Sequence, residues 1–454
     1  MAIPIGGLAT GLDTDTLVQK LMAVESRPVT TLQTRKVKYQ TLAAAFKDLN
    51  SKLSALKARA DVLKDPAIFF LRSVTSSDET VATASATSGT VRGTFSLTAS
   101  ALARGSLAAA GVTKSALTDS IASADGTLQF KLGATGTVVS VAVAAGATLD
   151  TLVAAINSAN GGVRATAVNT GTVATPAYKL TMTSNATGAA NNIVIVTDPT
   201  TIAIANTQTA TDAGFTVTGL GAFTRPTNTF SDVVDGVTIT LKKASGSTDL
   251  AVDYDKAATQ SKVQNLLEAY NSVIGAIDAQ TTAKTAADGA VQAGGFSGDA
   301  IPRVIRSGLA STIAFSVTGA FARLAEVGVT TQKDGTLTLD SAKFQKALGD
   351  NPVAVSTLFA GTTTKDGIAD LLSSKADTAT KAVTGTIATR QDGITATIKS
   401  IQKQVDAGLA RLAKTEQTLR ERFANLEQVV ARTQRTGSAL LAQLASFENS
   451  IKKS

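Results

Sequence analysis

The chain has 454 residues, of which 44% are hydrophobic, and a formal net charge of +8 at pH 7. This length predicts about three domains, and the apolar content is sufficient for sizeable cores. Cysteine, histidine and tryptophan are absent, which excludes catalytic thiolates, imidazole bases and the commonest zinc ligands. We therefore expect a protein that is not an enzyme and that needs no metal or cofactor.

The positive charge is concentrated at the two ends of the chain. Residues 1–70 carry 10 basic and 6 acidic side chains, residues 381–454 carry 12 and 6, and the residues between them carry 21 and 23. The ends could contact nucleic acid, but their charges flank apolar heptads, and aromatic residues that stack on bases make up only 4% of the chain. The pattern favours solvated helix faces and no nucleic-acid partner.

A narrow apolar repeat begins near the N-terminus. From Tyr39 to Leu63 apolar residues recur in steps of three and four, which is typical of a helix that packs along another helix in a coiled coil. Leu32 extends the repeat backwards by one heptad. A helix over residues 39–63 would be roughly 36 Å long at about 1.5 Å per residue. The positions of the repeat are Tyr39, Leu42, Phe46, Leu49, Leu53, Leu56, Ala60 and Leu63.

The region from about residue 71 to 250 has the composition of β-structure. It is rich in Thr, Val, Ala and Ser with frequent Gly, and the alternating runs at residues 94–98 and 237–241 predict half-buried strands. Within it, residues 148–157 have helical spacing, and Thr148 fits the N-cap position. We expect small β-domains, one of which has a helix packed on its sheet.

The helical pattern returns from about residue 251. Further along, Asp334-Gly335 predicts a tight hairpin turn, because these residue types supply the positive φ angles that such a turn requires. Apolar residues that share one face of the first of these helices are Val263, Leu266, Leu267 and Tyr270.

The C-terminal end repeats the heptad pattern. No proline follows Pro352, and Thr433 and Gly437 interrupt an otherwise apolar stripe. Each leucine replaced by such a residue forfeits part of the roughly 1.5 to 3 kcal/mol that full burial gives, so the stripe is weakest there. A self-contained bundle with no further role remains an alternative. The apolar positions are Ile394, Ile398, Ile401, Val405, Leu412, Leu419, Phe423, Leu426, Val430, Leu440, Leu444, Phe447 and Ile451.

Carboxylate-only hydrolysis is the catalytic option that this composition leaves open. Asp232 with Asp235, or Asp253 with Asp255, could form a carboxylate pair, although paired Asp residues beside strands usually belong to turns. Residues 219–221 (Gly-Leu-Gly) lack the third glycine of a dinucleotide fingerprint, and no Gly-Lys-Ser or Gly-Lys-Thr completes a phosphate loop. Nucleotide binding is not predicted.

The chain contains no run of about 18 apolar residues that could span a membrane. Its first residues include no basic segment of the kind that opens a secretory signal. We expect the protein to be cytosolic or to leave the cell by another route. The lack of cysteine would suit a chain that is threaded unfolded through a narrow channel and then meets oxidant.

Three groups of residues resemble motifs of known flagellar proteins. The first group is residues 7–14 (Gly-Leu-Ala-Thr-Gly-Leu-Asp-Thr), Leu17-Val18, Leu21-Met22, Glu25 and Pro28. The second is Gly328-Val329-Thr330, Asp334-Gly335-Thr336-Leu337, Leu339-Asp340, Phe344, Ala347-Leu348, Asn351-Pro352 and Leu358-Phe359. The third, looser group is Leu149, Ile156-Asn157, Ala165, Leu180 and residues 188–193.

The first two groups resemble the N- and C-terminal signatures of the flagellar hook-associated protein 2 family, the filament cap proteins, and the third resembles a repeat of flagellin-like proteins. The resemblance extends over essentially the whole chain. One departure is Thr433-Gln434, where the family often has Met-Asn.

The resemblance implies a structural assembly protein of the bacterial flagellum. Such a protein is exported unfolded through the flagellar type III apparatus and forms a ring-shaped homo-oligomer outside the cell, at the distal tip of the filament. There it promotes flagellin insertion and filament elongation, with adhesion as an additional possibility. The implied partners are further copies of the chain, flagellin, hook-filament junction proteins and an export chaperone.

Taken together, the patterns predict an α+β multidomain fold. Coiled-coil-like N- and C-terminal helices form a stalk, a leg domain combines helices and strands, and central head domains are β-rich. The expected boundaries are 1–40 for the N-terminal helical arm, 41–91 and 251–390 for the leg domain, 92–105 and 199–250 for the head domain, 106–198 for an inserted outer head domain, and 391–454 for the C-terminal helical arm.

Assembly on such a stalk would rest on its leucines. We expect those nearest the two termini to pack between the arms and against flagellin or the hook junction, with an intramolecular core as the alternative role. The residues predicted for assembly and packing are Leu17, Leu21, Leu42, Leu49, Leu53, Leu426, Leu440 and Leu444.

Two other functions remain open on the sequence. A surface adhesin would bind glycans through the β-rich head, although the absence of Trp offers no evident sugar platform. Another axial flagellar component, such as flagellin or a hook-filament junction protein, is the nearest alternative. Ring formation through the head domains would distinguish a cap from such a component.

Overall fold

The computed structural model describes residue 11 and residues 13–285 and 291–451. Its contacts divide the chain into two compact units. The helical unit takes its residues from the chain up to residue 65, from 261–347 and from 353 onward. The β-rich unit comprises residues 66–260 and 348–352, and is therefore inserted in the sequence between the terminal helices of the other unit.

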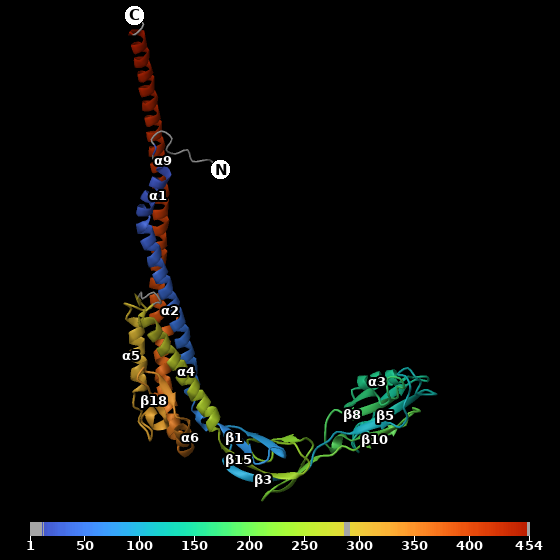
Figure 1. Cartoon of the computed structure of the whole chain (residues 1–454). Coiled ribbons are helices and arrows are strands. Elements are labelled where there is room, and N and C mark those ends of the chain that lie inside the picture. The colour runs from blue at the N-terminus through green and yellow to red at the C-terminus, as the bar shows by residue number, and fades with distance from the viewer. Residues whose placement is uncertain (1–10, 12, 286–290, 452–454) are drawn as a thin grey trace. The chain divides into compact units, whose positions relative to one another are not determined.

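Three helices come from the two ends of the chain: the short α1 (Thr14–Glu25) and the long α2 (Arg27–Leu63) and α9 (Thr386–Ile451). With 66 residues, α9 is about 100 Å long at about 1.5 Å per residue. Figure 1 shows α2 beside one part of α9 and α1 beside a part nearer the C-terminus. The predicted pairing of N- and C-terminal helices is confirmed.

The apolar repeat of α2 forms the inner face of this helix. Six of its positions are completely buried, and α2 contacts both α8 (Ile368–Thr380) and α9. The ring centroids of Phe46 and Phe296 are 5.0 Å apart. Near the C-terminal end of α2, the Ser373 hydroxyl of α8 donates a 2.6 Å hydrogen bond to Asp61. The six buried positions are Phe46, Leu49, Leu53, Leu56, Ala60 and Leu63.

The rest of the chain after residue 255 adds shorter elements. The helices are α4 (Lys256–Thr281), α5 (Ile301–Ile313), α6 (Ser341–Asp350), α7 (Pro352–Ala360) and the 3-10 helix η3 (Leu324–Val327). The two hairpins are β16 (Lys284–Thr285) with β17 (Val291–Gln292), and β18 (Val329–Thr331) with β19 (Leu337–Leu339). The predicted apolar face of α4 is confirmed, because Val263, Leu266, Leu267 and Tyr270 are all buried.

The turn between β18 and β19 differs from the predicted one. Thr331 pairs with Leu337, so the turn is longer than two residues, and of Asp334 and Gly335 only Gly335 has a positive φ, at 86°. Asp334 instead accepts hydrogen bonds from the backbone N–H and the hydroxyl of Thr336, at 2.9 and 2.7 Å. These bonds hold the pKa of the Asp334 carboxyl below its usual value. The residue closes the turn through its side chain rather than through its backbone.

One half of the β-rich unit is built around a five-stranded antiparallel sheet of order β1-β15-β3-β11-β12. A three-stranded sheet, β13-β14-β2, shares its core, in which the rings of Phe215 and Phe230 stack at 4.3 Å. The bounds are β1 (Arg72–Ser76), β2 (Ala82–Ala86), β3 (Gly93–Ala101), β11 (Ala213–Val217), β12 (Gly221–Arg225), β13 (Thr229–Phe230), β14 (Val237–Leu241) and β15 (Gly246–Tyr254), after the 3-10 helix η1 (Pro66–Phe70). The strands predicted at 94–98 and 237–241 are β3 and β14.

The other half combines a four-stranded sheet, β10-β4-β8-β7, a three-stranded sheet, β6-β5-β9, and the helix α3 (Leu149–Ser158). Thr148 caps α3 as predicted, in a reciprocal capping box with Thr151. The bounds are β4 (Leu107–Ala110), β5 (Gly126–Leu132), β6 (Val139–Val143), β7 (Val163–Asn169), β8 (Tyr178–Ser184), the 3-10 helix η2 (Ala189–Asn191), β9 (Ile193–Thr197) and β10 (Ile204–Gln208).

The strand pairing places two domain boundaries differently from the sequence prediction. The predicted leg domain extended to residue 91, but β1 and β2 pair with β15 and β14 inside the β-rich unit, which begins at residue 66. The predicted inserted domain ended at residue 198, but Ile202 and Ile204 lie in its core, and β10 pairs with β4. The remaining boundaries stay predictions.

The side chain of Asn157 links α3 to strand β7 through two hydrogen bonds. Its side-chain amide donates a 3.0 Å hydrogen bond to the carbonyl of Ala165 on β7, and its carbonyl accepts a 2.8 Å bond from the Ala165 backbone N–H. Both backbone groups of Ala165 are thus satisfied by one side chain.

Replacing Asn157 by Ala should loosen β7, because Ala165 loses both of these partners. We expect the free energy of local opening to fall by about 1 to 3 kcal/mol. The measurement is hydrogen exchange of the amides of β7, read by mass spectrometry. Ser158→Ala, on the exposed last residue of α3, is the control. Equal exchange in the two variants would show that this side chain does not hold the strand.

Candidate assembly surface

The helical unit has a small core where the two ends of the chain meet. It lies between α2 and α9, so residues more than 370 positions apart in the sequence pack together. Lys36 of α2 also donates a hydrogen bond to the side-chain carbonyl of Gln402 on α9. The core consists of Val29, Ile401 and Val405, with Leu32, Tyr39 and Leu412 packed around it.

Gly408 of α9 lies directly against Val29 of α2. A Cβ placed on Gly408 would lie 2.7 Å from Val29 Cγ2 and 3.9 Å from Val29 Cβ. A separation of 2.7 Å is well below an ordinary carbon-carbon contact of about 3.5 to 4.0 Å. Glycine therefore lets Val29 of α2 lie directly on the backbone of α9.

Nearer the C-terminus, α1 takes the place of α2 beside α9. Thr14 and Val18 are the buried residues of α1, at 9% and 2% exposure. Arg420 of α9 forms an ion pair with Asp15 of α1 at 2.7 Å and with Glu416 of its own helix at 3.0 Å. These hydrogen bonds raise the pKa of Arg420 further above its usual value. The contact is narrower than that between α2 and α9.

Both helices expose apolar side chains on surfaces away from these contacts. We call the exposed group on α9 the distal strip: Leu426, Val429, Leu440, Leu441 and Leu444, with 44 to 69% exposure. The exposed group on α1, the α1 strip, comprises Leu17, Leu21 and Val24, with 42 to 56% exposure.

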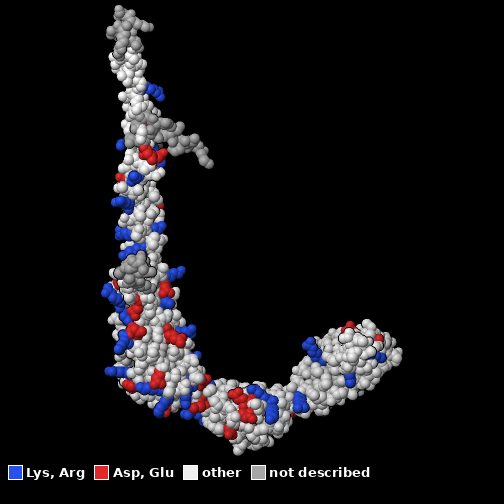
Figure 2. Space-filling view, in the orientation of Figure 1, with Lys and Arg blue, Asp and Glu red and all other residues white. Residues whose placement is uncertain are grey.

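The C-terminal members of the distal strip, Leu440, Leu441 and Leu444, lie in a part of α9 that carries no charge. Residues 436–447 include no Lys, Arg, Asp or Glu. Figure 2 shows the described C-terminal end of α9 as almost uncharged on the face in view, whereas charges of both signs cover the rest of the helical unit. Exposed apolar residues in an uncharged stretch are typical of a surface that binds another protein.

The eight residues predicted for assembly and packing fall into two groups. Leu49 and Leu53 are completely buried in the helical unit, and Leu42 is half-buried beside them on α2. Leu17 and Leu21 belong to the α1 strip, and the rest belong to the distal strip. The structure thus buries Leu49 and Leu53 inside the unit, leaves Leu42 half-buried, and exposes the other five to a partner.

The interruptions at Thr433 and Gly437 do not break α9, which continues to Ile451. The Thr433 hydroxyl donates a 2.9 Å hydrogen bond to the carbonyl of Val429, one turn earlier. A Cβ placed on Gly437 would meet nothing within 4 Å. These residues are exposed, so the predicted weak point of the stripe lies within the surface available to partners.

The carboxylate pairs considered from the sequence have structural partners. Asp253 forms ion pairs with Arg92 at 2.7 Å and with Lys256 at 3.6 Å. Burial raises the pKa of Asp253, but the backbone N–H of Tyr254 and these two cations outweigh it and lower the pKa overall. Asp255 accepts a 2.7 Å hydrogen bond from the N–H of Ala258 in the first turn of α4.

The second pair is similar. Asp232 forms an ion pair with Arg225 at 2.9 Å, which lowers the pKa of Asp232.

In the part of the chain that the structure describes, no cluster of three or more acidic residues could hold a metal ion. No described helix combines the length and hydropathy needed to cross a bilayer.

Sequence reasoning missed the packing roles of Val18, Gly408 and Arg420 in the contacts with α9. Gly408 could have been found, because it continues the spacing of Ile401, Val405 and Leu412, and a glycine at a seam position indicates a close approach of two backbones. The bridge from Arg420 to Asp15 could not, since it joins residues 405 positions apart.

These features define the class of the chain. It is a multidomain α+β protein with a stalk of paired N- and C-terminal helices, a β-rich unit inserted between them in the sequence, and apolar strips exposed on the terminal helices.

Comparison with known proteins gives the family. The model of the flagellar hook-associated protein 2 N-terminus matches residues 10–106, that of the C-terminus matches residues 210–435, and the flagellin hook IN motif matches residues 127–186. The A-type flagellar hook-associated protein 2 of Pseudomonas aeruginosa is 30% identical over 99% of both chains. The chain belongs to the flagellar hook-associated protein 2 family and is a flagellar filament cap protein.

Two further relatives agree. Flagellar hook-associated protein 2 of Aeromonas caviae is 26% identical over 99% of this chain and 100% of the relative. The crystal structure of the flagellar cap protein FliD D1-D2-D3 domains from Escherichia coli is similar with a TM-score of 0.57 and 25% identity, over 77% of this chain and 99% of that one. The predicted fold class is confirmed.

The contact between α2 and α9 can be tested at Gly408. Replacing Gly408 by Leu should separate the two helices, because the added side chain overlaps Val29, and we expect a loss of about 1 to 3 kcal/mol of stability. Gly393→Leu is the matched control on the same helix, where a Cβ meets nothing within 4 Å. The Gly393→Leu variant should be more stable than the wild type by up to about 1 kcal/mol, because leucine has a higher helix propensity than glycine. Urea unfolding followed by circular dichroism measures both, and equal midpoints would contradict the packing.

Proposed function

We propose that this chain forms a ring-shaped homo-oligomer at the distal tip of the flagellar filament, outside the cell, and promotes the insertion of flagellin subunits as the filament grows. The role is one of binding and assembly, and it requires no catalytic step. Family membership and the exposed apolar strips on α1 and α9 support this proposal.

The distal strip is the observation on which the proposal mainly rests. Fully burying a leucine is worth roughly 1.5 to 3 kcal/mol, so leucines left half or more exposed can still gain part of this energy against a partner. Leu440 and Leu444 are 58% and 59% exposed on a helix about 100 Å long. Within this proposal, these leucines, with Leu426 and the α1 strip, contact neighbouring subunits, flagellin or a hook-filament junction protein.

A closed ring requires that different surfaces of neighbouring copies meet and that the rotation between them closes. The β-rich unit, with its two cores, offers rigid surfaces for such contacts. The same terminal helices are candidates for the contact with an export chaperone, because their apolar strips would otherwise be exposed before assembly.

The growth of a filament requires contacts that can be exchanged as subunits enter. Thr433 and Gly437 occupy two positions of the apolar stripe of α9 where a large apolar side chain would otherwise stand. The apolar area that a partner can bury on this part of α9 is therefore limited. We propose that this part of α9 binds successive partners weakly enough to release them.

Replacing Leu426 by Asp tests the assembly role, because it places a charge in the distal strip. We expect filament growth and motility to be lost, while the melting temperature of the purified protein stays within error of the wild type, since the side chain is 44% exposed. The measurements are swimming assays and electron microscopy of filaments on cells that carry the variant.

Gln428→Asp is the matched control, because Gln428 is exposed two residues along α9 and faces away from Leu426. It should swim normally. Normal filaments on cells with Leu426→Asp would show that the distal strip takes no part in assembly.

A further inference from the structure

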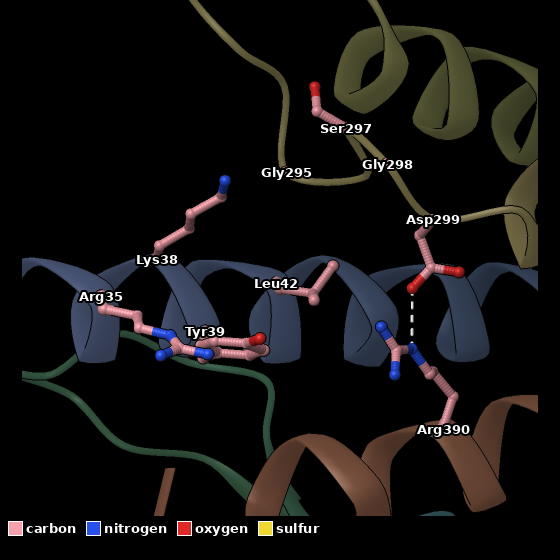
Figure 3. Close-up of a pocket in the computed structure, with 9 residues that line it drawn as sticks. All are labelled: Arg35, Lys38, Tyr39, Leu42, Gly295, Ser297, Gly298, Asp299 and Arg390. Atoms are coloured by element: carbon pink, nitrogen blue, oxygen red, sulfur yellow. Dashed lines mark hydrogen bonds and ion pairs between the residues drawn. The ribbon is translucent and has the colours of Figure 1, made fainter. Parts of the chain in front are cut away.

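The helical unit contains a pocket that the assembly surface does not use. Its volume is about 280 Å³, and it lies between α2, the N-terminal part of α9 and the loop that precedes α5. Figure 3 shows Lys38 pointing from α2 toward the loop residues Gly295 and Ser297, with Arg390 reaching Asp299 from α9. The full lining is Arg35, Lys38, Tyr39, Leu42, Gly295, Ser297, Gly298, Asp299 and Arg390.

The single carboxylate of the pocket is already neutralised. Asp299 has a side-chain exposure of 6%, and its Oδ2 accepts a 2.7 Å hydrogen bond from Arg390 Nε. Its Oδ1 accepts a 3.1 Å bond from the backbone N–H of Ile301, in the first turn of α5. Asp299 therefore cannot also compensate the other cations of the pocket.

Two cations remain. Arg35 and Lys38 are exposed, and no ion pair involves either of them among the residues that the structure describes. The guanidinium of Arg35 lies 5.9 Å from the ring centroid of Tyr39, which keeps it at the edge of the pocket. With Asp299 and Arg390 paired, the lining has a net charge of about two positive units, which favours an anionic ligand.

The shape and the uncharged lining narrow the class of anion. Leu42 and the ring of Tyr39 form an apolar wall, and the hydroxyl of Ser297 is a further hydrogen-bond donor. The volume is several times the roughly 30 Å³ that one water occupies in the liquid. A carboxylate carried on methylene groups matches both parts of the lining, since its charge is attracted by the cations while its stem packs against apolar side chains.

We propose that this pocket binds an acidic peptide segment of another protein molecule, by taking a Glu or Asp side chain beside Lys38, with Arg35 adding positive charge from its place over Tyr39. The site is distinct from the apolar strips and does not depend on ring formation. It would add a charge-dependent contact at the part of the stalk that lies farthest from the distal strip along α9.

The test uses the full-length protein and a fluorescently labelled hexaglutamate peptide as the probe, with binding followed by anisotropy at low salt. Replacing both Arg35 and Lys38 by Gln should weaken binding by about tenfold, the sum expected of two exposed ion pairs. The matched control replaces Lys47 and Arg59 by Gln. It removes the same two charge types from exposed positions of α2 outside the pocket, and should bind like the wild type.

Each outcome decides the proposal. If both double variants bind the peptide equally more weakly than the wild type, the peptide is attracted by the net charge of α2 and not by the pocket. If the variant without Arg35 and Lys38 binds the peptide as tightly as the wild type, the site is excluded. If inorganic sulfate at matched ionic strength binds the wild type more tightly than the peptide does, the pocket takes free anions and the peptide proposal is wrong. None of these readings requires rings, so a failure of the proposed function would be recognised separately.

Discussion

The contact of α2 with α9 is the constraint on which the rest of the helical unit depends. Val29 lies on the backbone of α9 at Gly408, and Ile401 and Val405 complete a core formed by residues from opposite ends of the chain. The β-rich unit, mainly residues 66–260, is inserted in the sequence between segments of this helical unit. Beyond this contact, the shorter α1 lies beside α9, with Thr14 and Val18 buried and an ion pair between Asp15 and Arg420.

The exposure of the apolar residues of α9 differs along the helix, and this difference bears on the proposed function. Where α2 covers α9, the apolar residues of the stripe are buried within the chain; toward the C-terminus the same stripe continues with its leucines exposed. A chain that only needed a stable stalk would gain nothing from extending an apolar, uncharged helix in this way. Under the proposed function, this exposed surface would contact other subunits, so the family assignment and the exposed strips are consistent with each other.

The sequence predicted elements where one periodicity dominates and failed where contacts are distant. The heptads of α2, the face of α4, the capped helix α3 and the strands β3 and β14 were predicted because local spacing determines them. Strands β1 and β2 fell within the predicted leg domain, 41–91, because their pairing with β15 and β14, far along the chain, cannot be derived from local spacing. The leucines of the stripe were found, but the spacing could not separate Leu49, which is buried, from Leu440, which is exposed, because that depends on where each partner helix ends. The basic pocket combines three separate segments and has no sequence signal.

The pairing of the two ends can be tested most directly by a disulfide, because the chain contains no cysteine of its own. The Cβ positions of residues 29 and 408 are 3.9 Å apart, within the range of about 3.5 to 4.5 Å found in disulfides. The double variant Val29→Cys, Gly408→Cys should form an intramolecular crosslink under mild oxidation, seen as a mobility shift that reductant reverses. Val29→Cys with Gly393→Cys, about 22 Å away along α9, should not. No crosslink in the first variant, or equal crosslinking in both, would contradict the paired stalk.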